Sequence, residues 1–150
     1  MKNILLAIVA VFTLTATYAQ LKPVSWKFSS KKISDKEYEI HMTATIKNGW
    51  HLYSQTQPKG AIAIPTKFVF VNNPLVVLKG NVAEVGKLEK YQDPILKVTA
   101  NQYSNSVTFV QKVTLKAPAK TNVSGNVTFQ TCDDKQCLPP EKVSFNVSLG

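Results

Sequence analysis

The sequence predicts an all-β protein, specifically an immunoglobulin-like antiparallel β-sandwich. Apolar and polar residues alternate along most of the chain, which is the period of a half-buried strand. Glycine, proline and asparagine separate these short runs, and no segment beyond the N-terminal region shows the period of a helix. Many short strands with frequent turns are typical of two packed antiparallel sheets.

Three runs show the alternation most clearly. Residues 38–46 alternate along their whole length, so one face of this strand is expected in the core. Residues 107–115 repeat the pattern with Gln111 as a polar interruption, and residues 143–149 repeat it without one. Shorter strands are expected, in chain order, at residues 24–28, 50–53, 67–71, 75–78 and 123–129. The expected turns are residues 47–49, 57–60, 72–74, 93–94 and 117–118.

Residues 1–19 have the features of a cleaved secretory signal peptide. Lys2 supplies a positive charge, residues 4–14 form an apolar run, and Ala19 is a small residue at the cleavage position. The run is shorter than the roughly 20 residues that a membrane-spanning helix needs. We therefore expect a mature chain, residues 20–150, that forms a single domain without a membrane span. Its expected location is the periplasm rather than the extracellular medium, and disulfides persist in both.

The charge pattern argues against a nucleic-acid partner. The formal net charge is +9, but all 18 basic residues are lysines, scattered along the chain. Arginine supplies the planar donor group that recognises bases and phosphates, and the sequence has none. We interpret the lysines as a solvated surface.

The two cysteines, Cys132 and Cys137, are close enough in sequence to pair with each other. Closing so small a ring would stabilise the fold by only about 2 kcal/mol. A mature chain of about 130 residues can form a core without cross-links. A disulfide that is made and broken in turnover is therefore favoured, and a structural staple is the alternative.

The expected strands place this pair at the tip of a hairpin. The strand at residues 123–129 leads toward Cys132, and the last strand follows Cys137. No helix N-terminus is expected there to lower a thiol pKa, and Asp133 and Asp134 oppose thiolate formation. We therefore expect the oxidised pair to act as an electrophile, attacked by the thiolate of a reducing partner.

A metal site is the other chemistry that these residue types allow. His41 and His51 together with the two cysteines could supply four zinc ligands, but their spacing is not that of a zinc finger. His41 is also expected on the solvent face of its strand. We therefore expect no metal and no other cofactor.

The segment from Val127 to Glu141 resembles the active-site hairpin of the N-terminal periplasmic domain of the thiol:disulfide interchange protein DsbD, also called the disulfide bond corrector domain. Residues 49–54, Gly-Trp-His-Leu-Tyr-Ser, are similar to an early strand of that family, whose aromatic residues flank the cysteines. Together with the strand pattern, the resemblance covers essentially the whole mature chain and implies an immunoglobulin-like domain.

The resemblance also implies roles for individual residues. Cys137 matches the family cysteine that forms a mixed disulfide with partners, and Cys132 matches the one that resolves it. Tyr53 and His51 would flank the pair. Tyr91, in residues 88–93, would belong to a loop that shields the cysteines.

The function implied by the resemblance is an electron relay. Such a domain takes electrons from a membrane-embedded thiol reductase through a thioredoxin-like domain, and passes them to periplasmic disulfide isomerases and cytochrome c maturation proteins. This sequence carries neither reductase domain, so we expect both to act in trans on a protein-disulfide reductase component. The competing hypothesis is a non-catalytic binding module of the cell envelope whose cysteines form a structural disulfide.

Overall fold

The computed structural model describes residues 21–150, so the predicted signal peptide, residues 1–19, lies outside the described part of the chain. Residues 21–150 form strands and loops and include no helix that could cross a membrane. Every pairing between strands is antiparallel. The predicted immunoglobulin-like β-sandwich is confirmed.

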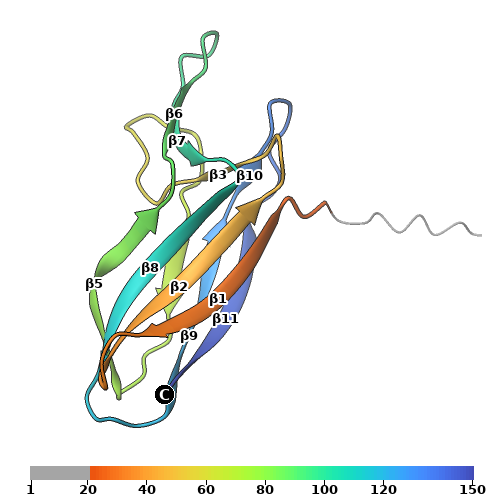
Figure 1. Ribbon diagram of the computed structural model, residues 1–150. Helices are drawn as coiled ribbons and strands as arrows, with labels where there is room; N and C mark the ends of the chain where they lie inside the picture. Colours follow the sequence, from red (N-terminus) through yellow and green to blue (C-terminus); the bar gives the residue numbers. More distant parts are fainter. Residues whose placement is uncertain (1–20) are drawn as a thin grey trace, which may run out of the picture.

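Two sheets form the sandwich (Figure 1). The first sheet has the order β1 (Val24–Lys32), β2 (Glu37–Ile46), β8 (Ser106–Leu115) and β5 (Val76–Val85). The second has the order β11 (Glu141–Leu149), β9 (Thr121–Phe129) and β4 (Lys67–Phe70).

A third, small sheet lies at one end of the sandwich (Figure 1). Its order is β10 (Thr131–Cys132), β3 (His51–Tyr53), β7 (Thr99–Tyr103) and β6 (Glu89–Gln92). Three of these strands continue, across a short turn or bend, from strands of the sandwich: β3 follows β2, β7 precedes β8 and β10 follows β9. The small sheet is therefore built on the ends of the long strands.

All eight strands expected from the alternation are present, with β1 and β5 longer than expected. The strands β6, β7 and β10 were not expected. Their sequences, Glu-Lys-Tyr-Gln, Thr-Ala-Asn-Gln-Tyr and Thr-Cys, are too polar or too short to show an apolar alternation.

The core lies between the two large sheets. Ile40, Met42 and Phe109 are fully buried, and Trp26 packs on Phe109 with 5.9 Å between ring centroids. Gln111, expected as a polar interruption, is only 2% exposed. Its side-chain amide donates to the backbone carbonyls of Lys79 at 3.1 Å and Lys112 at 2.8 Å, where β5 bulges between Lys79 and Ala83.

A half-buried carboxylate joins the small sheet to the sandwich. The Glu84 carboxylate of β5 accepts hydrogen bonds from Ser54 Oγ at 2.8 Å, from the Gln55 backbone N–H at 2.7 Å and from the Tyr103 hydroxyl at 2.5 Å. Burial and the Glu84 carboxylate raise the pKa of Tyr103, so its hydroxyl stays a donor. Charge-assisted bonds of this kind are among the stronger ones in proteins.

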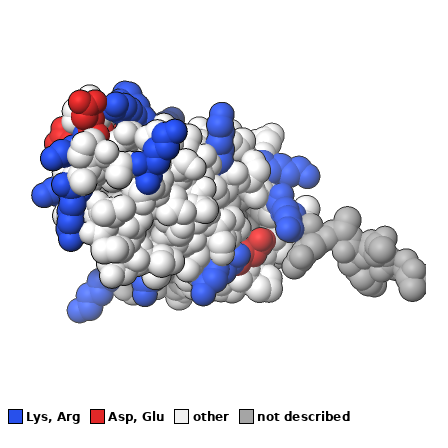
Figure 2. Space-filling model, turned by 90° about the horizontal axis from the view of Figure 1, so that it is seen from below, with Lys and Arg blue, Asp and Glu red and all other residues white. Residues whose placement is uncertain are grey.

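Lysine side chains are spread over the face of the molecule that is seen from below (Figure 2). Figure 2 also shows uncharged surface between these side chains. This distribution fits the interpretation of the lysines as a solvated surface.

Gly125 allows the closest approach in the second sheet. It lies opposite Phe70 of β4 and Phe145 of β11. A Cβ at this position would lie 2.4 Å from the Val69 carbonyl oxygen and 2.7 Å from Phe145 Cζ. Only glycine fits here without a shift of the β4 backbone.

We expect Gly125→Ala to lower the free energy of unfolding by about 1–3 kcal/mol, because the added methyl group must displace backbone and an aromatic ring. Urea denaturation followed by fluorescence measures the change. Gly86→Ala is the matched control, since its nearest contact would be 3.3 Å. Equal unfolding free energies for Gly125→Ala and the unchanged protein would contradict the prediction.

Candidate functional site

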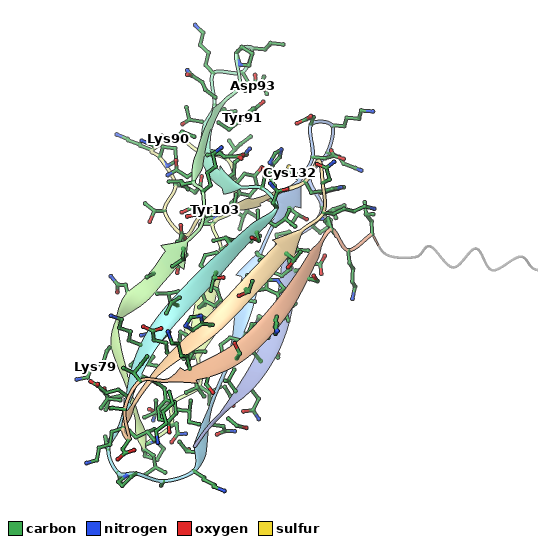
Figure 3. The ribbon with its side chains drawn as sticks, in the orientation of Figure 1. Lys79, Lys90, Tyr91, Asp93, Tyr103 and Cys132 are labelled. Atoms are coloured by element: carbon green, nitrogen blue, oxygen red, sulfur yellow. A yellow bond between two sulfur atoms is a disulfide. The ribbon has the colours of Figure 1, made fainter. Side chains whose placement is uncertain are left out.

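The two cysteines form a disulfide at the tip of the hairpin between β9 and β11, as the strand pattern predicted. The sulfurs are 1.99 Å apart and the Cα atoms 4.0 Å apart. After Phe129 the chain leaves the second sheet, and β10 pairs with β3, with Thr131 opposite Leu52 and Cys132 opposite His51. Figure 3 shows Cys132 at this end of the sandwich.

Backbone and side-chain hydrogen bonds hold the loop between the cysteines. The Asp133 N–H donates to the Gln136 carbonyl at 2.9 Å. Asp133 Oδ1 accepts from the N–H groups of Lys135 at 2.8 Å and Gln136 at 2.7 Å, and these two bonds hold the pKa of Asp133 below its usual range. Below the disulfide, the Leu138 N–H donates to the Thr131 carbonyl at 2.9 Å. The tip is thus closed by bonds that do not involve sulfur.

The two cysteines differ in exposure. Cys132 is only 4% exposed, whereas Cys137 is exposed. An attacking thiolate must approach a disulfide sulfur directly, and the exposed position of Cys137 leaves this residue more open to such an approach than Cys132. The described chain, residues 21–150, places no helix N-terminus at the pair that would stabilise a thiolate.

A cavity of about 470 Å³ opens beside the disulfide. Both cysteines line it together with Tyr53, Tyr91 and His51, so the structure brings together all five residues singled out from the sequence. Burial, with a smaller effect of Tyr91, raises the pKa of Tyr53. Desolvation and the Asp93 carboxylate raise the pKa of Tyr91. Both phenols are therefore neutral hydrogen-bonding groups at physiological pH.

The hairpin of β6 and β7 projects beyond the sandwich and carries Tyr91 (Figures 1 and 3). The expectation that residues 88–93 form a loop is wrong for residues 89–92, which form β6 and pair with β7. Asp93 closes the tip, because its Oδ1 accepts from the N–H groups of Ile95 at 2.8 Å and Leu96 at 2.7 Å. These two apolar side chains are 86% and 68% exposed.

Sequence reasoning missed the residues behind His51. The Nδ1 atom of His51 lies 3.0 Å from Ser104 Oγ, and Ser104 Oγ donates a hydrogen bond to Glu89 Oε2 at 3.0 Å. Its Nε2 lies 3.9 Å from Asp134 Oδ1. Glu89 belongs to β6 and Ser104 follows β7, which are two strands that the alternation did not predict.

The other histidine lies elsewhere. His41 is on β2, where its Nε2 lies 3.0 Å from Glu39 Oε2. Among residues 21–150, no three side chains of His, Cys, Asp or Glu are grouped in a way that could hold a metal ion.

The fold and the site together define a class of protein, an immunoglobulin-like sandwich domain with a solvent-accessible disulfide at one end. Within this class, residues 18–149 match the family model of the N-terminal domain of the thiol:disulfide interchange protein DsbD. The chain therefore belongs to the DsbD N-terminal domain family, which transfers reducing equivalents in disulfide exchange. No curated protein matches the sequence.

Solved structures share the fold. The N-terminal domain of DsbD from Neisseria meningitidis, in its reduced form, has a TM-score of 0.53 and 13% identity, over 84% of this chain and 85% of that chain. The N-terminal periplasmic domain of ScsB from Proteus mirabilis has a TM-score of 0.54 and 15% identity, over 82% of this chain and 44% of that chain. The complex between the N-terminal domains of DsbD and PilB from N. meningitidis has a TM-score of 0.50 and 14% identity, over 85% of this chain and 87% of that chain.

We expect reduction of the disulfide to lower the free energy of unfolding by no more than about 2 kcal/mol, because the ring is short. We also expect the hydrogen bonds of the tip to remain after reduction, because none of them involves sulfur. Urea midpoints measured with and without reductant give the difference. Unfolding of the protein on reduction would contradict this and would favour a structural staple.

We expect Asp133→Ala to destabilise the protein near neutral pH, with a difference that narrows in acid. The folded-state pKa of Asp133 is lowered, so its contribution is present above the unfolded pKa of about 3.9 and is lost as the pH falls through the folded pKa. Urea denaturation between about pH 2 and pH 7 tests this sign.

Asp134→Ala is the matched control. Within the described chain, the Asp134 carboxylate accepts no hydrogen bond from a backbone N–H. If Asp133→Ala destabilises the protein equally from about pH 7 to about pH 2, the charge of the Asp133 carboxylate does not contribute to the free energy of unfolding.

Proposed function

We propose that this chain is a thiol–disulfide exchange domain that takes up reducing equivalents at Cys137 and passes them on through the Cys132–Cys137 pair. The observation that carries the proposal is the asymmetry of the disulfide. An exposed cysteine is bonded to a buried one beside a cavity, at the tip of a hairpin that is closed by its own hydrogen bonds.

The exchange follows from this asymmetry. A thiolate of the reducing partner attacks Cys137 Sγ, a bond forms between the partner sulfur and Cys137, and the Cys132–Cys137 bond breaks with its electron pair left on Cys132. The partner's second thiolate then attacks the partner sulfur of the mixed disulfide and releases Cys137. The partner leaves oxidised and the domain is reduced.

The reverse sequence delivers the electrons. The Cys137 thiolate attacks an oxidised protein, and Cys132 resolves the mixed disulfide. Because no helix dipole activates either thiol, we expect the domain to be reduced readily but to attack slowly by itself.

A protein partner suits the surroundings of the cysteines. Tyr91 and Leu96 of the projecting hairpin and Ile62 of the loop before β4 present exposed apolar surface at the cavity. The solved complex of DsbD and PilB domains supports docking of a separate domain on this fold. We propose a thioredoxin-like or membrane-embedded thiol reductase, acting in trans, as the electron donor.

We propose the periplasm as the location and residues 20–150 as one mature domain after removal of the signal peptide. The periplasmic ScsB domain of the same fold supports the location. Oxidised disulfide isomerases and cytochrome c maturation proteins are the acceptors that the family resemblance suggests.

The alternative is a binding module with a structural disulfide. The hydrogen bonds that close the tip speak against a need for a staple. The reduction potential separates the two functions, since structural disulfides lie below about −300 mV and exchange proteins lie higher.

We expect Cys132→Ser to accumulate a mixed disulfide with a reducing thioredoxin-like protein, because Cys137 remains reachable and nothing resolves the bond. Cys137→Ser leaves only the buried Cys132. This variant should accumulate at most about a tenth as much mixed disulfide, and a tenfold ratio corresponds to a free-energy difference of about 1.4 kcal/mol.

Non-reducing gels measure the covalent complexes, and mass spectrometry identifies the sulfur that is joined. The double variant without either cysteine is the control. Equal trapping by both single variants would contradict the assignment of Cys137, and no trapping by either would favour the binding module.

A further inference from the structure

His51 lies directly beside the buried sulfur. It is the partner of Cys132 across the β3–β10 pair. Opposed residues of an antiparallel pair place their side chains on one face, with Cβ atoms about 4.5–5.5 Å apart. Both side chains line the same cavity, and the His51 side chain is 24% exposed. The imidazole therefore has access to both solvent and Cys132.

The hydrogen bonds behind the ring determine which nitrogen carries the proton. The Ser104 hydroxyl has one hydrogen, and it is donated to the Glu89 carboxylate at 3.0 Å. Ser104 Oγ can therefore only accept from His51 Nδ1, which lies 3.0 Å away. Nδ1 carries the hydrogen, so Nε2 of the neutral ring is the basic nitrogen.

Nε2 is available for a proton. Asp134 Oδ1, at 3.9 Å, is beyond hydrogen-bonding distance, and no other residue of the described chain bonds to Nε2. Charged and titratable side chains line the cavity with His51, and Glu89 lies behind Ser104. The cavity-lining groups are Tyr53, Tyr91, Asp93, Asp133, Asp134 and Lys135. Asp134 and Glu89 place a carboxylate on each side of the ring, where they can pair with the charge that the ring gains on protonation.

We propose that His51 Nε2 exchanges a proton with Cys132 Sγ during each half of the disulfide cycle, with Ser104 and Glu89 as positioning residues. This inference rests on the proposed function. When the Cys132–Cys137 bond breaks, the electron pair stays on Cys132 Sγ and the imidazolium supplies its proton. When Cys132 resolves a mixed disulfide, neutral His51 takes the thiol proton and Cys132 Sγ attacks Cys137 Sγ. The Cys132–Cys137 bond forms, the bond between Cys137 and the partner sulfur breaks, and the partner leaves as a thiolate.

Because Cys132 is buried, its thiol needs a nearby group to accept and return the proton. A thiolate is disfavoured in a poorly solvated position, and Cys132 is only 4% exposed. A base on the adjacent strand provides the proton acceptor that water cannot readily supply there.

Resolution by Cys132 can be measured without a protein partner. Reduced protein is mixed with 5,5′-dithiobis(2-nitrobenzoate), and Cys137 attacks the reagent and releases one thionitrobenzoate. Cys132 then attacks Cys137 and releases the second. The second phase of colour is intramolecular, and Cys132→Ser shows the first phase alone.

We expect His51→Asn to slow the second phase by about 100-fold below pH 7, because general-base catalysis contributes on this order. Asparagine keeps a donor toward Ser104 but cannot exchange a proton. The difference in second-phase rate between His51→Asn and the unchanged protein should become smaller as the pH rises, because Cys132 then ionises without a base. Free imidazole should restore the second phase of His51→Ala, and Ser104→Ala should show a smaller deficit than His51→Asn.

His41→Asn is the matched control, because His41 bonds to Glu39 on β2 and does not line the cavity. It should leave both phases unchanged. Equal rates of the second phase in His51→Asn and the unchanged protein would overturn the role of His51. A slower second phase that neither varies with pH nor responds to imidazole would do the same. Both outcomes would leave the proposed function standing. A pH-dependent His51 effect in a protein that no thioredoxin reduces would instead contradict the proposed function alone.

Discussion

The chemistry at this end of the sandwich depends on the register between β10 and β3. Thr131 and Leu52 are paired and buried, at 2% and 0% exposure, so the next pair, Cys132 and His51, lies on the other face. A slip of one residue would exchange the two faces and turn the sulfur toward the core. The Leu138 N–H bond to the Thr131 carbonyl adds to the contacts that fix this register.

Both apolar packing and polar contacts hold the small sheet in place, since Leu52 of β3 and Tyr103 of β7 belong to the main core. The buried cluster at the site consists only of Tyr53, Ala100 and Cys132, with Ala63 packed against it. The Glu84 carboxylate, which accepts from three partners, adds a polar connection between the small sheet and the sandwich. This construction suits a site that must stay open to another protein.

The alternation of apolar and polar residues predicted the sandwich because β2, β8 and β11 each bury one face. It could not predict β6, which extends away from the core and buries no face, or β7, in which the polar residues Asn101 and Gln102 interrupt the alternation. The position of the cysteines at a hairpin tip could be predicted, because it depends only on the two strands that flank them. The surroundings of His51 could not, because Ser104 and Glu89 come from the hairpin that left no pattern.

The closed tip has a consequence for the direction of electron flow. Because hydrogen bonds that do not involve sulfur hold the backbone of residues 131–138, we expect the oxidised and reduced forms to present nearly the same surface. A partner that binds two states equally well shifts no equilibrium between them. Under the proposed function, docking would then leave the redox couple of the domain unchanged, and electrons would pass from a donor of lower potential to an acceptor of higher potential without selective recognition of the reduced form.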